Sequence, residues 1–460
     1  MSVCSSVSIS QVEYLRLDAD FYHPKYLQEL KTLRTVDERV GVAKLLHLIS
    51  APVRTGRTPS SRHIKEDDEI VKFIKTDGIR EGRINFDSSG ELPKRVLNDN
   101  DFIPADSVVV TIIGATPEIV GRVAIVREAD PRCVTNQNVA VITTNSKCDP
   151  YFLMAYFQTC LGRDQFWRHS RRTEQVNLNC REVERVLVPT PDISLQREIG
   201  DFVRVSFAAN DNSESLYTQA QQLLESELGL DKLRFDKPVG YTARFSELEL
   251  SRRADAEFFN PELRYFQQEI AKHHPLRPIT DFVSILKFSN PPYADIGLPI
   301  ITQKHLGKMS PDNYGDDLVA HDSWVQANPL ASIRNYDLLY YSVGAYLGKT
   351  NIWLSNDKAV HASFITMLRP FDSEESGFLH VLLNSEYGIL QSKCFQSGTS
   401  QPYIYPKDIR RFLIPTVSKS VRCQIHELVI DSFNKGEESK QLLAQAKSRV
   451  EQLIEEAVQS

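Results

Sequence analysis

Hydrophobic residues recur at helical spacing along two long stretches of the chain. Residues 194–228 contain no proline and, apart from Gly200, no glycine, and their apolar side chains return every three or four positions. Residues 421–458 carry a matching stripe. Such stripes predict helices that pack on a partner helix, and the simplest partner of each stretch is the other. Two unrelated helices, each packed on its own globular part, would leave the same stripes.

Shorter β-rich runs, which glycine and proline interrupt, fill much of the remaining chain. Their length and their valine, isoleucine and tyrosine content favour strands. The runs are 71–76, 107–113, 122–126 and 138–143 in the first half, and 299–302, 337–343, 350–354 and 363–368 in the second. One helix follows in each half, at 151–160 and at 378–384. The pattern therefore predicts two mixed α/β modules of about 180 residues each.

The two halves are copies of one unit. Residues 16–24 read Arg-Leu-Asp-Ala-Asp-Phe-Tyr-His-Pro, and residues 253–261 read Arg-Ala-Asp-Ala-Glu-Phe-Phe-Asn-Pro. From Tyr151 onward, the first half matches the second for about eighty residues without a gap, each partner lying 226 positions later. We therefore expect a mixed α/β fold with a pseudo-twofold internal repeat, in which two tandem globular domains are separated by two long helices that pair as an antiparallel coiled coil. The expected boundaries are 1–192 for the first module, 193–235 for the first long helix, 236–416 for the second module and 417–460 for the second long helix.

Composition favours a soluble cytoplasmic protein. The 460 residues are 41% hydrophobic, and the longest apolar runs fall far short of the ~20 residues that a membrane-spanning helix needs. The polar N-terminal segment lacks the basic and apolar regions of a signal peptide. The seven cysteines show no Cys-x-x-Cys spacing, which argues against a zinc site or a disulfide framework.

The net charge says little about whether the protein binds nucleic acid. The value of −6, from 54 Lys+Arg and 60 Asp+Glu, argues mildly against a nucleic-acid binder, because such domains usually carry a basic excess. The acidic balance is concentrated in and around the two helical stretches, however. The modules are therefore near neutral and can hold locally basic runs.

Three local signatures join the repeat in indicating a family. They are Thr-Gly-Arg-Thr-Pro at 55–59, Gly-x-x-x-Gly-Lys at 344–349 with a looser partner at 114–122, and Thr-Asn-Gln-Asn at 135–138. With the tandem modules and the paired helices, they make the chain resemble the specificity (S) subunits of Type I restriction–modification systems over essentially its whole length. The second copy has Phe-Ser-Asn-Pro-Pro at 288–292 in place of the first signature, as expected of modules that read different sequences.

The resemblance implies a function and partners. Each module would be a target recognition domain that reads half of a bipartite site in double-stranded DNA, and the paired helices would fix the gap between the halves. The helices would also dock two methyltransferase (M) subunits, and restriction (R) subunits would complete the complex. The chain itself would be a non-catalytic recognition subunit without a cofactor or a metal.

Two motifs imitate catalytic or nucleotide-binding sites. Asn-Pro-Pro-Tyr at 290–293 looks like the catalytic motif of adenine-N6 methyltransferases, but the sequence lacks the glycine-rich motif that would hold S-adenosylmethionine. The tetrapeptide falls where the first copy has Thr58-Pro59, so we interpret it as a proline-rich turn. The segment 344–350 has three residues between its glycines, whereas a phosphate-binding loop has four, and we interpret it as a β-turn that presents Lys349.

Contacts to DNA need cations for phosphates, and amides, hydroxyls or arginines for base edges. The segment between the late helix and the closing strand of each module is rich in these groups, and an ordinary solvated loop is the alternative interpretation. Its candidates are Arg168, Arg171, Arg172, Gln175 and Asn177 in the first copy, and Lys393, Ser397, Thr399, Gln401 and Tyr403 in the second.

Further candidates follow the central strands. One group is Lys75, Thr76, Arg80 and Arg83, matched in the second copy by Gln303 and Lys304. Another is Asn136 with Gln137, which we align with His361 and Ala362. Buried polar residues that close turns would look the same in the sequence.

Two other functions stay open at this level. One is a DNA adenine methyltransferase in its own right, based on Asn290-Pro291-Pro292-Tyr293. The other is a repeat scaffold that binds only polypeptides. Binding of S-adenosylmethionine by the isolated chain would favour the first, and a lack of salt-dependent duplex binding would favour the second.

Overall fold

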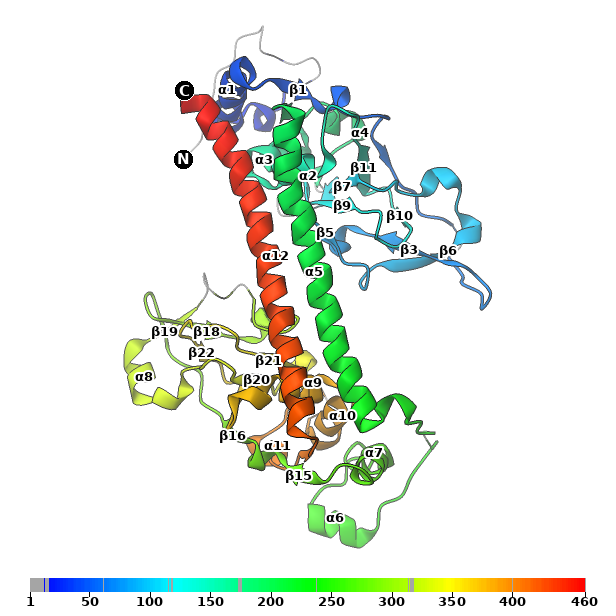
Figure 1. Cartoon of the computed structure of the whole chain (residues 1–460), viewed down its shortest axis with the longest axis vertical. Helices are drawn as coiled ribbons and strands as arrows, with labels where there is room; N and C mark the ends of the chain where they lie inside the picture. The colour runs from blue at the N-terminus through cyan, green and yellow to red at the C-terminus, as the bar shows by residue number, and fades with distance from the viewer. Residues whose placement is uncertain are drawn as a thin grey trace. The chain divides into compact units, whose positions relative to one another are not determined.

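The chain folds into two compact units that share two long helices. The computed structural model describes residues 12, 16–60, 62–114, 116, 119–172, 176–236, 238–312, 314, 318–398 and 400–459. Unit 1 comprises Met1–Ala209 with Glu438–Ser460, and unit 2 comprises Asn210–Glu437. The two long helices, α5 (Ile193–Leu228) and α12 (Lys419–Gln459), each contribute one part to either unit (Figure 1). Both helices confirm the prediction made from hydrophobic spacing.

Serine side chains show how these helices pair. In unit 1 the Ser206 hydroxyl donates to the backbone carbonyl oxygen of Ser439 at 2.8 Å, and the Ser439 hydroxyl donates to that of Ser206. In unit 2, Ser213 and Ser432 exchange the same two bonds, each of 2.7 Å. The contact moves forward along α5 as it moves back along α12, so the helices are antiparallel. It also follows the repeat, because Ser432 and Ser439 lie 226 positions after Ser206 and Ser213.

Unit 1 is a mixed α/β unit built from small sheets. The largest is antiparallel, in the order β2 (Arg54–Thr55), β11 (Val139–Thr143), β7 (Ser107–Thr111), β9 (Val123–Val126). A second has the order β10 (Cys133–Thr135), β3 (Ile70–Ile74), β6 (Gly90–Pro93), with β10 parallel to β3. A third has the order β12 (Arg171–Arg172), β13 (Val176–Asn177), β8 (Ile113–Gly114). Two-stranded pairs join β1 (Val42–Lys44) to β14 (Leu187–Pro189) and β4 (Ile79–Arg80) to β5 (Arg83–Ile84). The helices are α1 (Pro24–Arg39), α2 (Pro150–Gln158), α3 (Cys160–His169) and α4 (Cys180–Val183).

Unit 2 repeats this plan with different details. One sheet has the order β16 (Val283–Leu286), β23 (Ile365–Pro370), β20 (Leu338–Tyr341), β21 (Thr350–Ile352). Another has the order β17 (Tyr293–Ala294), β19 (Val319–Ala320), β18 (Leu298–Ile301), β22 (Val360–His361), with β22 parallel to β18. The strand β15 (Leu276–Pro278) pairs with β24 (Leu413–Pro415). The helices are α6 (Phe245–Ser251), α7 (Pro261–Ala271), α8 (Asp322–Ala327), α9 (Ser376–Asn384), α10 (Glu386–Phe395) and α11 (Pro406–Ile409).

The helix α2 is apolar on all sides because it is buried on all sides. Every residue from Tyr151 to Phe157 is buried. Asp149 caps this helix by accepting hydrogen bonds from the backbone N–H groups of Tyr151 and Phe152 at 2.9 and 3.0 Å. The core of unit 1 continues from α2 to β7 and to the apolar stripes of α5 and α12, which supply residues such as Val203 and Val450. The core of unit 2 is built in the same way around α9.

The predicted elements are confirmed where their own sequence carries the signal. Each predicted β-rich run contains a strand of the structure, and the helices predicted at 151–160 and 378–384 are α2 and α9. Several strands of two or three residues, such as β10 and β12, were not predicted. They are too short to carry a periodic pattern, and they are defined by their pairing with another strand, which lies far along the chain for β10 and nearby for β12.

Candidate nucleic-acid interface

A short β-ladder follows the late helix of unit 1. After α3 ends at His169, Arg171 pairs with Asn177 across β12 and β13, and Asn177 also pairs with Ile113 of β8. The Arg171 side chain is 64% exposed and Asn177 is exposed, so both can reach a ligand. Gln175, between the two strands, lies outside the described residues, as does the side chain of Arg172 on β12.

Unit 2 has single β-bridges at the equivalent positions. Ser397 and Tyr403 exchange two backbone hydrogen bonds of 2.8 Å, and Tyr403 is also bridged to Val343. Ser397 and Tyr403 lie 226 positions after Arg171 and Asn177. The candidate Thr399 lies outside the described residues. We refer to the described residues of segments 171–177 and 397–403, which are 171–172 with 176–177 and 397–398 with 400–403, as the recognition hairpins.

Two groups of candidates meet at the ends of parallel strands in unit 1. Ile74 at the end of β3 lies opposite Thr135 at the end of β10, so Lys75 and Gln137 follow adjacent strand ends. Both side chains are exposed. Gln137 also accepts a hydrogen bond of 2.9 Å from the Thr58 hydroxyl. The side-chain carbonyl oxygen of Asn136 accepts one of 3.0 Å from the backbone N–H of Asn138, which is a turn-closing contact. Thr76, which begins the short helical turn after β3, is half-buried.

In unit 2 the corresponding strand ends join the recognition hairpin. Ile301 lies opposite His361, and the Gln303 side-chain amide donates to the carbonyl oxygen of Val343. Since Val343 is bridged to Tyr403, Gln303 lies close to the recognition hairpin of unit 2. The structural equivalent of His361 is Thr135, one residue earlier than the sequence alignment placed it. Burial lowers the pKa of the His361 imidazole to about 4, so this side chain is neutral at pH 7.

Exposed cations are found among the candidates of both units. Arg80 lies on β4 of unit 1, while Lys304, Lys349 and Lys393 lie in unit 2, and all four are exposed, as is the candidate Gln401. The segment 344–350 opens with a short 3-10 helical turn at Gly344–Tyr346, the backbone N–H of Lys349 then donates to the Tyr346 carbonyl oxygen at 3.0 Å, and β21 begins at Thr350. The interpretation of this glycine motif as a turn that presents Lys349 is therefore confirmed.

Two arginines among the candidates make internal contacts instead. Arg168 is buried, and its guanidinium lies 3.8 Å from the ring centroid of Phe21. Arg83 donates to the hydroxyls of Ser206 and Ser439 between the long helices. The sequence does not distinguish these arginines from Arg171, because burial depends on tertiary packing.

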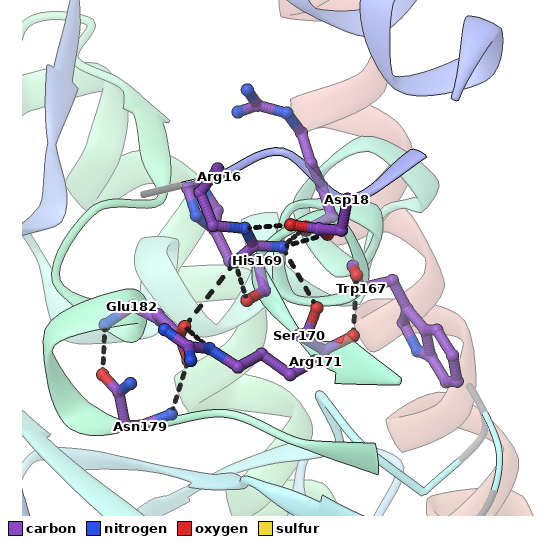
Figure 2. A network of polar contacts seen from close by, with 9 residues as sticks. Arg16, Asp18, Trp167, His169, Ser170, Arg171, Asn179 and Glu182 are labelled. Carbon is purple, nitrogen blue, oxygen red and sulfur yellow. Dashed lines mark hydrogen bonds and ion pairs between the residues drawn. The ribbon is translucent and has the colours of Figure 1, made fainter. Parts of the chain in front are cut away.

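A network around a further arginine was not recognised from the sequence (Figure 2). The Arg16 guanidinium makes two hydrogen bonds of 2.9 Å to the Asp18 carboxylate and lies 3.6 Å from a Glu182 oxygen. Glu182 also accepts hydrogen bonds from Arg171 Nε at 3.0 Å and from the backbone N–H of Asn179 at 2.9 Å. The repeated Arg-x-Asp-Ala-acid-Phe segment was the signal that could have identified this site.

Lys287 is a second residue that sequence reasoning missed. Its ammonium group donates to the hydroxyls of Ser342 at 2.7 Å and Thr366 at 3.2 Å, immediately beside Val343. Burial lowers the pKa of Lys287 to about 8. This partly buried lysine therefore binds the residue that precedes Val343, which is bridged to the recognition hairpin of unit 2.

Two further observations concern other classes of site. In the part of the chain that the structure describes, no cluster of three His, Cys, Asp or Glu residues has the arrangement of a metal site. Among the same residues, no helix combines the length and apolar character required to cross a bilayer.

Comparison with known proteins identifies one family. Residues 48–222 match the family model of the Type I restriction modification DNA specificity domain. This range contains β2 through β14, including the recognition hairpin of unit 1, and most of α5. The matched segment is therefore similar to the same family that the sequence resembles. No curated protein sequence matches the chain.

Solved structures with a similar course of the chain include two specificity subunits. The S subunit of a Type I restriction–modification system from M. genitalium shares 12% identity, with 90% of this chain and 95% of that one covered, at a TM-score of 0.47. The HsdS subunit from Thermoanaerobacter tengcongensis shares 17% identity over 90% of this chain and 95% of that one, at a TM-score of 0.29.

Proposed function

Since residues 48–222 form a Type I restriction–modification DNA specificity domain, we propose that the whole chain is the specificity subunit of such a system and recognises a bipartite target in double-stranded DNA. Each module would read one half of the target. The observation that carries this proposal is the recognition hairpin, which recurs at equivalent positions in both units, paired as strands in unit 1 and through single β-bridges in unit 2. We assign target recognition domains to 1–192 and 236–416, and spacer helices to 193–235 and 417–460.

The side chains on this shared frame differ between the modules. Unit 1 presents Arg171 and Asn177, whereas unit 2 presents Ser397 and Tyr403 at the same positions. Arginine pairs well with guanine and asparagine with adenine in the major groove, while serine and tyrosine offer hydroxyl groups. One backbone frame with different side chains supports two half-sites of different sequence.

Phosphate contacts would come from the exposed cations near the hairpins. Lys75 and Arg80 belong to unit 1, and Lys304, Lys349 and Lys393 belong to unit 2. Such contacts fix the position of the protein on the duplex without reading its sequence. They also make binding weaker as the salt concentration rises.

The long helices are the proposed docking site of the protein partners. We assign two methyltransferase subunits and the restriction subunits to the assembled complex, with catalysis residing in those partners. The acidic balance around α5 supports this assignment, because such a helix is repelled by DNA and is free to bind protein. The chain itself would be non-catalytic and carry no cofactor.

Mapping of methylated sites in cells tests the proposal directly. The chain is expressed with its methyltransferase partner, first intact and then with residues 1–192 replaced by the first module of another specificity subunit. We expect a split motif in the first case, and in the second a change confined to one half of that motif. A contiguous motif, or a change in both halves, would contradict the proposal.

Purified protein provides a second test. Binding of the full-length chain to duplexes that contain the mapped site is expected to be sequence-selective and to weaken with salt. Arg34 lies exposed on α1, so Arg34→Ala serves as a charge-matched control for substitutions at Arg171. Selectivity that falls equally in both variants would exclude a specific role for Arg171.

A further inference from the structure

Arg16 holds the end of the helix that leads into the first recognition hairpin. Its Nη1 donates to the carbonyl oxygen of His169 at 2.8 Å, and its Nη2 donates to those of Arg168 at 3.2 Å and Ser170 at 3.3 Å. These carbonyl groups belong to the C-terminal end of α3 and to its cap. Ser170 is followed directly by Arg171, the first residue of the hairpin.

The second module repeats this arrangement with its own residues. Arg253 donates to the carbonyl oxygens of Phe395, at 3.0 Å, and Gln396 at the end of α10. Asp255 binds the guanidinium of Arg253 on its other edge, as Asp18 binds that of Arg16. Phe395 and Gln396 lie 226 positions after His169 and Ser170. The two repeats therefore share the contact, although the segments that make it are offset differently along the chain.

Physical chemistry explains why an arginine occupies this place. The last carbonyl groups of a helix have no partner within the helix and carry its negative dipole end. A planar guanidinium has five donors in a fixed geometry, so it can bind several of these oxygens and a carboxylate at once. The ammonium group of lysine cannot reproduce that fork. Arg16 is almost fully buried, at 4% exposure, so its charge is committed to these contacts.

Unit 1 adds a direct link from this arginine to the hairpin. Glu182 lies between Arg16, at 3.6 Å, and Arg171, at 3.0 Å. Glu182 is itself held by the backbone N–H of Asn179. Arg16 thus fixes both the backbone that enters the hairpin and the carboxylate that orients its exposed arginine. Unit 2 has Ser397 in the place of Arg171 and lacks this second link among its described residues.

We propose that Arg16 and Arg253 are positioning residues for DNA recognition, each setting the register of one recognition hairpin and therefore the sequence selectivity of one half-site. This inference rests on the proposed function, since it requires that the hairpins read DNA. Neither arginine touches the duplex. In each repeat, the arginine of the opening segment holds the backbone that leads into the recognition hairpin of the same module.

The experiment compares Arg16→Lys, Arg16→Gln, Arg253→Lys and Arg253→Gln in the full-length chain. Each protein is titrated with the mapped duplex and with duplexes that carry single base changes in either half-site. We expect both Arg16 variants to lose about fivefold or more of the discrimination in the first half-site, with the second half-site unchanged. The Arg253 variants should show the opposite pattern. The salt slope should stay that of the wild type, because no phosphate contact is removed.

Hydrogen exchange on the same proteins without DNA provides an independent measurement. Backbone amides of 171–177 should exchange faster in the Arg16 variants, and those of 397–403 faster in the Arg253 variants. The exposed substitution Arg34→Gln is the control for the loss of one positive charge from unit 1. It should change neither discrimination nor exchange in the hairpins.

The outcomes separate this inference from the proposed function. If the wild-type protein binds DNA without sequence preference, both the proposed function and this inference are wrong. Wild-type selectivity that the Arg16 and Arg253 variants retain would overturn the positioning role alone. A fall in discrimination that is equal in both half-sites would also overturn that role. So would wild-type behaviour of Arg16→Lys, because charge and not geometry would then be sufficient.

Discussion

The side-chain carbonyl oxygen of Asn290 accepts a hydrogen bond of 2.7 Å from the backbone N–H of Ser363. The register of the main sheets makes Thr58 and Gln137 the equivalent pair in the first module, with Thr58 one residue later than the alignment of 288–292 with 55–59 placed it, and their side chains are joined at 2.9 Å. Both contacts tie the segment after the edge strand of the main sheet to the turn that precedes the central strand. The Asn-Pro-Pro-Tyr segment is therefore a turn anchor, as its place in the repeat predicted.

This geometry predicts that the purified chain transfers no methyl group to DNA. Asn290 is engaged with the backbone, and the sequence offers no binding motif for S-adenosylmethionine. Incubation with DNA and labelled S-adenosylmethionine should leave the DNA unlabelled for the wild type and for Asn290→Ala alike. Robust labelling by the wild type that disappears in Asn290→Ala would restore the methyltransferase interpretation.

Removal of the two hairpin arginines should weaken binding and its salt dependence. Arg171→Ala combined with Arg172→Ala should lower the slope of the log–log salt plot by about 2 if both side chains meet phosphates. If either arginine reads guanine, discrimination at one base pair should fall by ~1–3 kcal/mol instead. Fluorescence titrations at several salt concentrations measure both quantities. An unchanged slope together with unchanged selectivity would place both arginines away from the DNA.

The partly buried Lys287 predicts a pH-dependent stability. Its pKa is lowered to about 8, whereas the unfolded chain keeps this proton up to about 10.4. Between these values the unfolded state binds more protons than the folded state, so stability rises with pH. The cost of burying the charged ammonium is fully present below pH 8 and is lost towards pH 10.

The variant Lys287→Met should remove that cost. Its free energy of unfolding at pH 7 should exceed that of the wild type by about 1–2 kcal/mol, a figure reduced for the partial exposure of the side chain. The difference should shrink between pH 8 and 10, as measured by chemical denaturation at each pH. Lys393→Met, at an exposed position, is the control and should show no such trend. A difference that is constant with pH would mean that the Lys287 charge is not the cause.

Lengthening both long helices should lengthen the DNA spacer. Four residues inserted after Asn210 and four after Asn434 add just over one turn, about 6 Å, to each helix. These points leave the Ser206–Ser439 contact on one side of the insertion and the Ser213–Ser432 contact on the other. We expect the same two half-sites with a spacer longer by one or two base pairs, because a base pair rises ~3.4 Å. Methylation mapping that returns the original spacer would show that the helices do not set this distance.

The sequence predicts those features whose physical cause lies within a short window. The stripes of α5 and α12 and the apolar runs of β7 and β20 are local patterns, and the repeat at 226 positions by itself relates Arg171 to Ser397. The positions of Arg83 and Arg168 are not predictable in this way. Each resembles Arg171 in sequence, yet one lies against the long helices and the other lies on Phe21.

Contacts between distant segments are the other part that the sequence does not reveal. The bond from Arg16 to the His169 carbonyl spans 153 positions, and nothing near either residue specifies the other. The parallel pairing of β3 with β10 is of the same kind. Such contacts depend on how helices and strands pack in three dimensions, which the repeat of a motif can suggest but not locate.

The recognition hairpins are held almost entirely through main-chain atoms. Tyr403 and Ser397 are joined by backbone hydrogen bonds, and Arg16 and Arg253 bind carbonyl oxygens that every amino acid possesses. A mutation at an exposed hairpin position therefore changes the side chain on the surface but leaves these main-chain hydrogen bonds in place. If the hairpins read DNA as proposed, a substitution there would change the recognition of one half-site while these main-chain contacts remain. The exposed hairpin positions can therefore be substituted without removing the main-chain contacts that hold the hairpins.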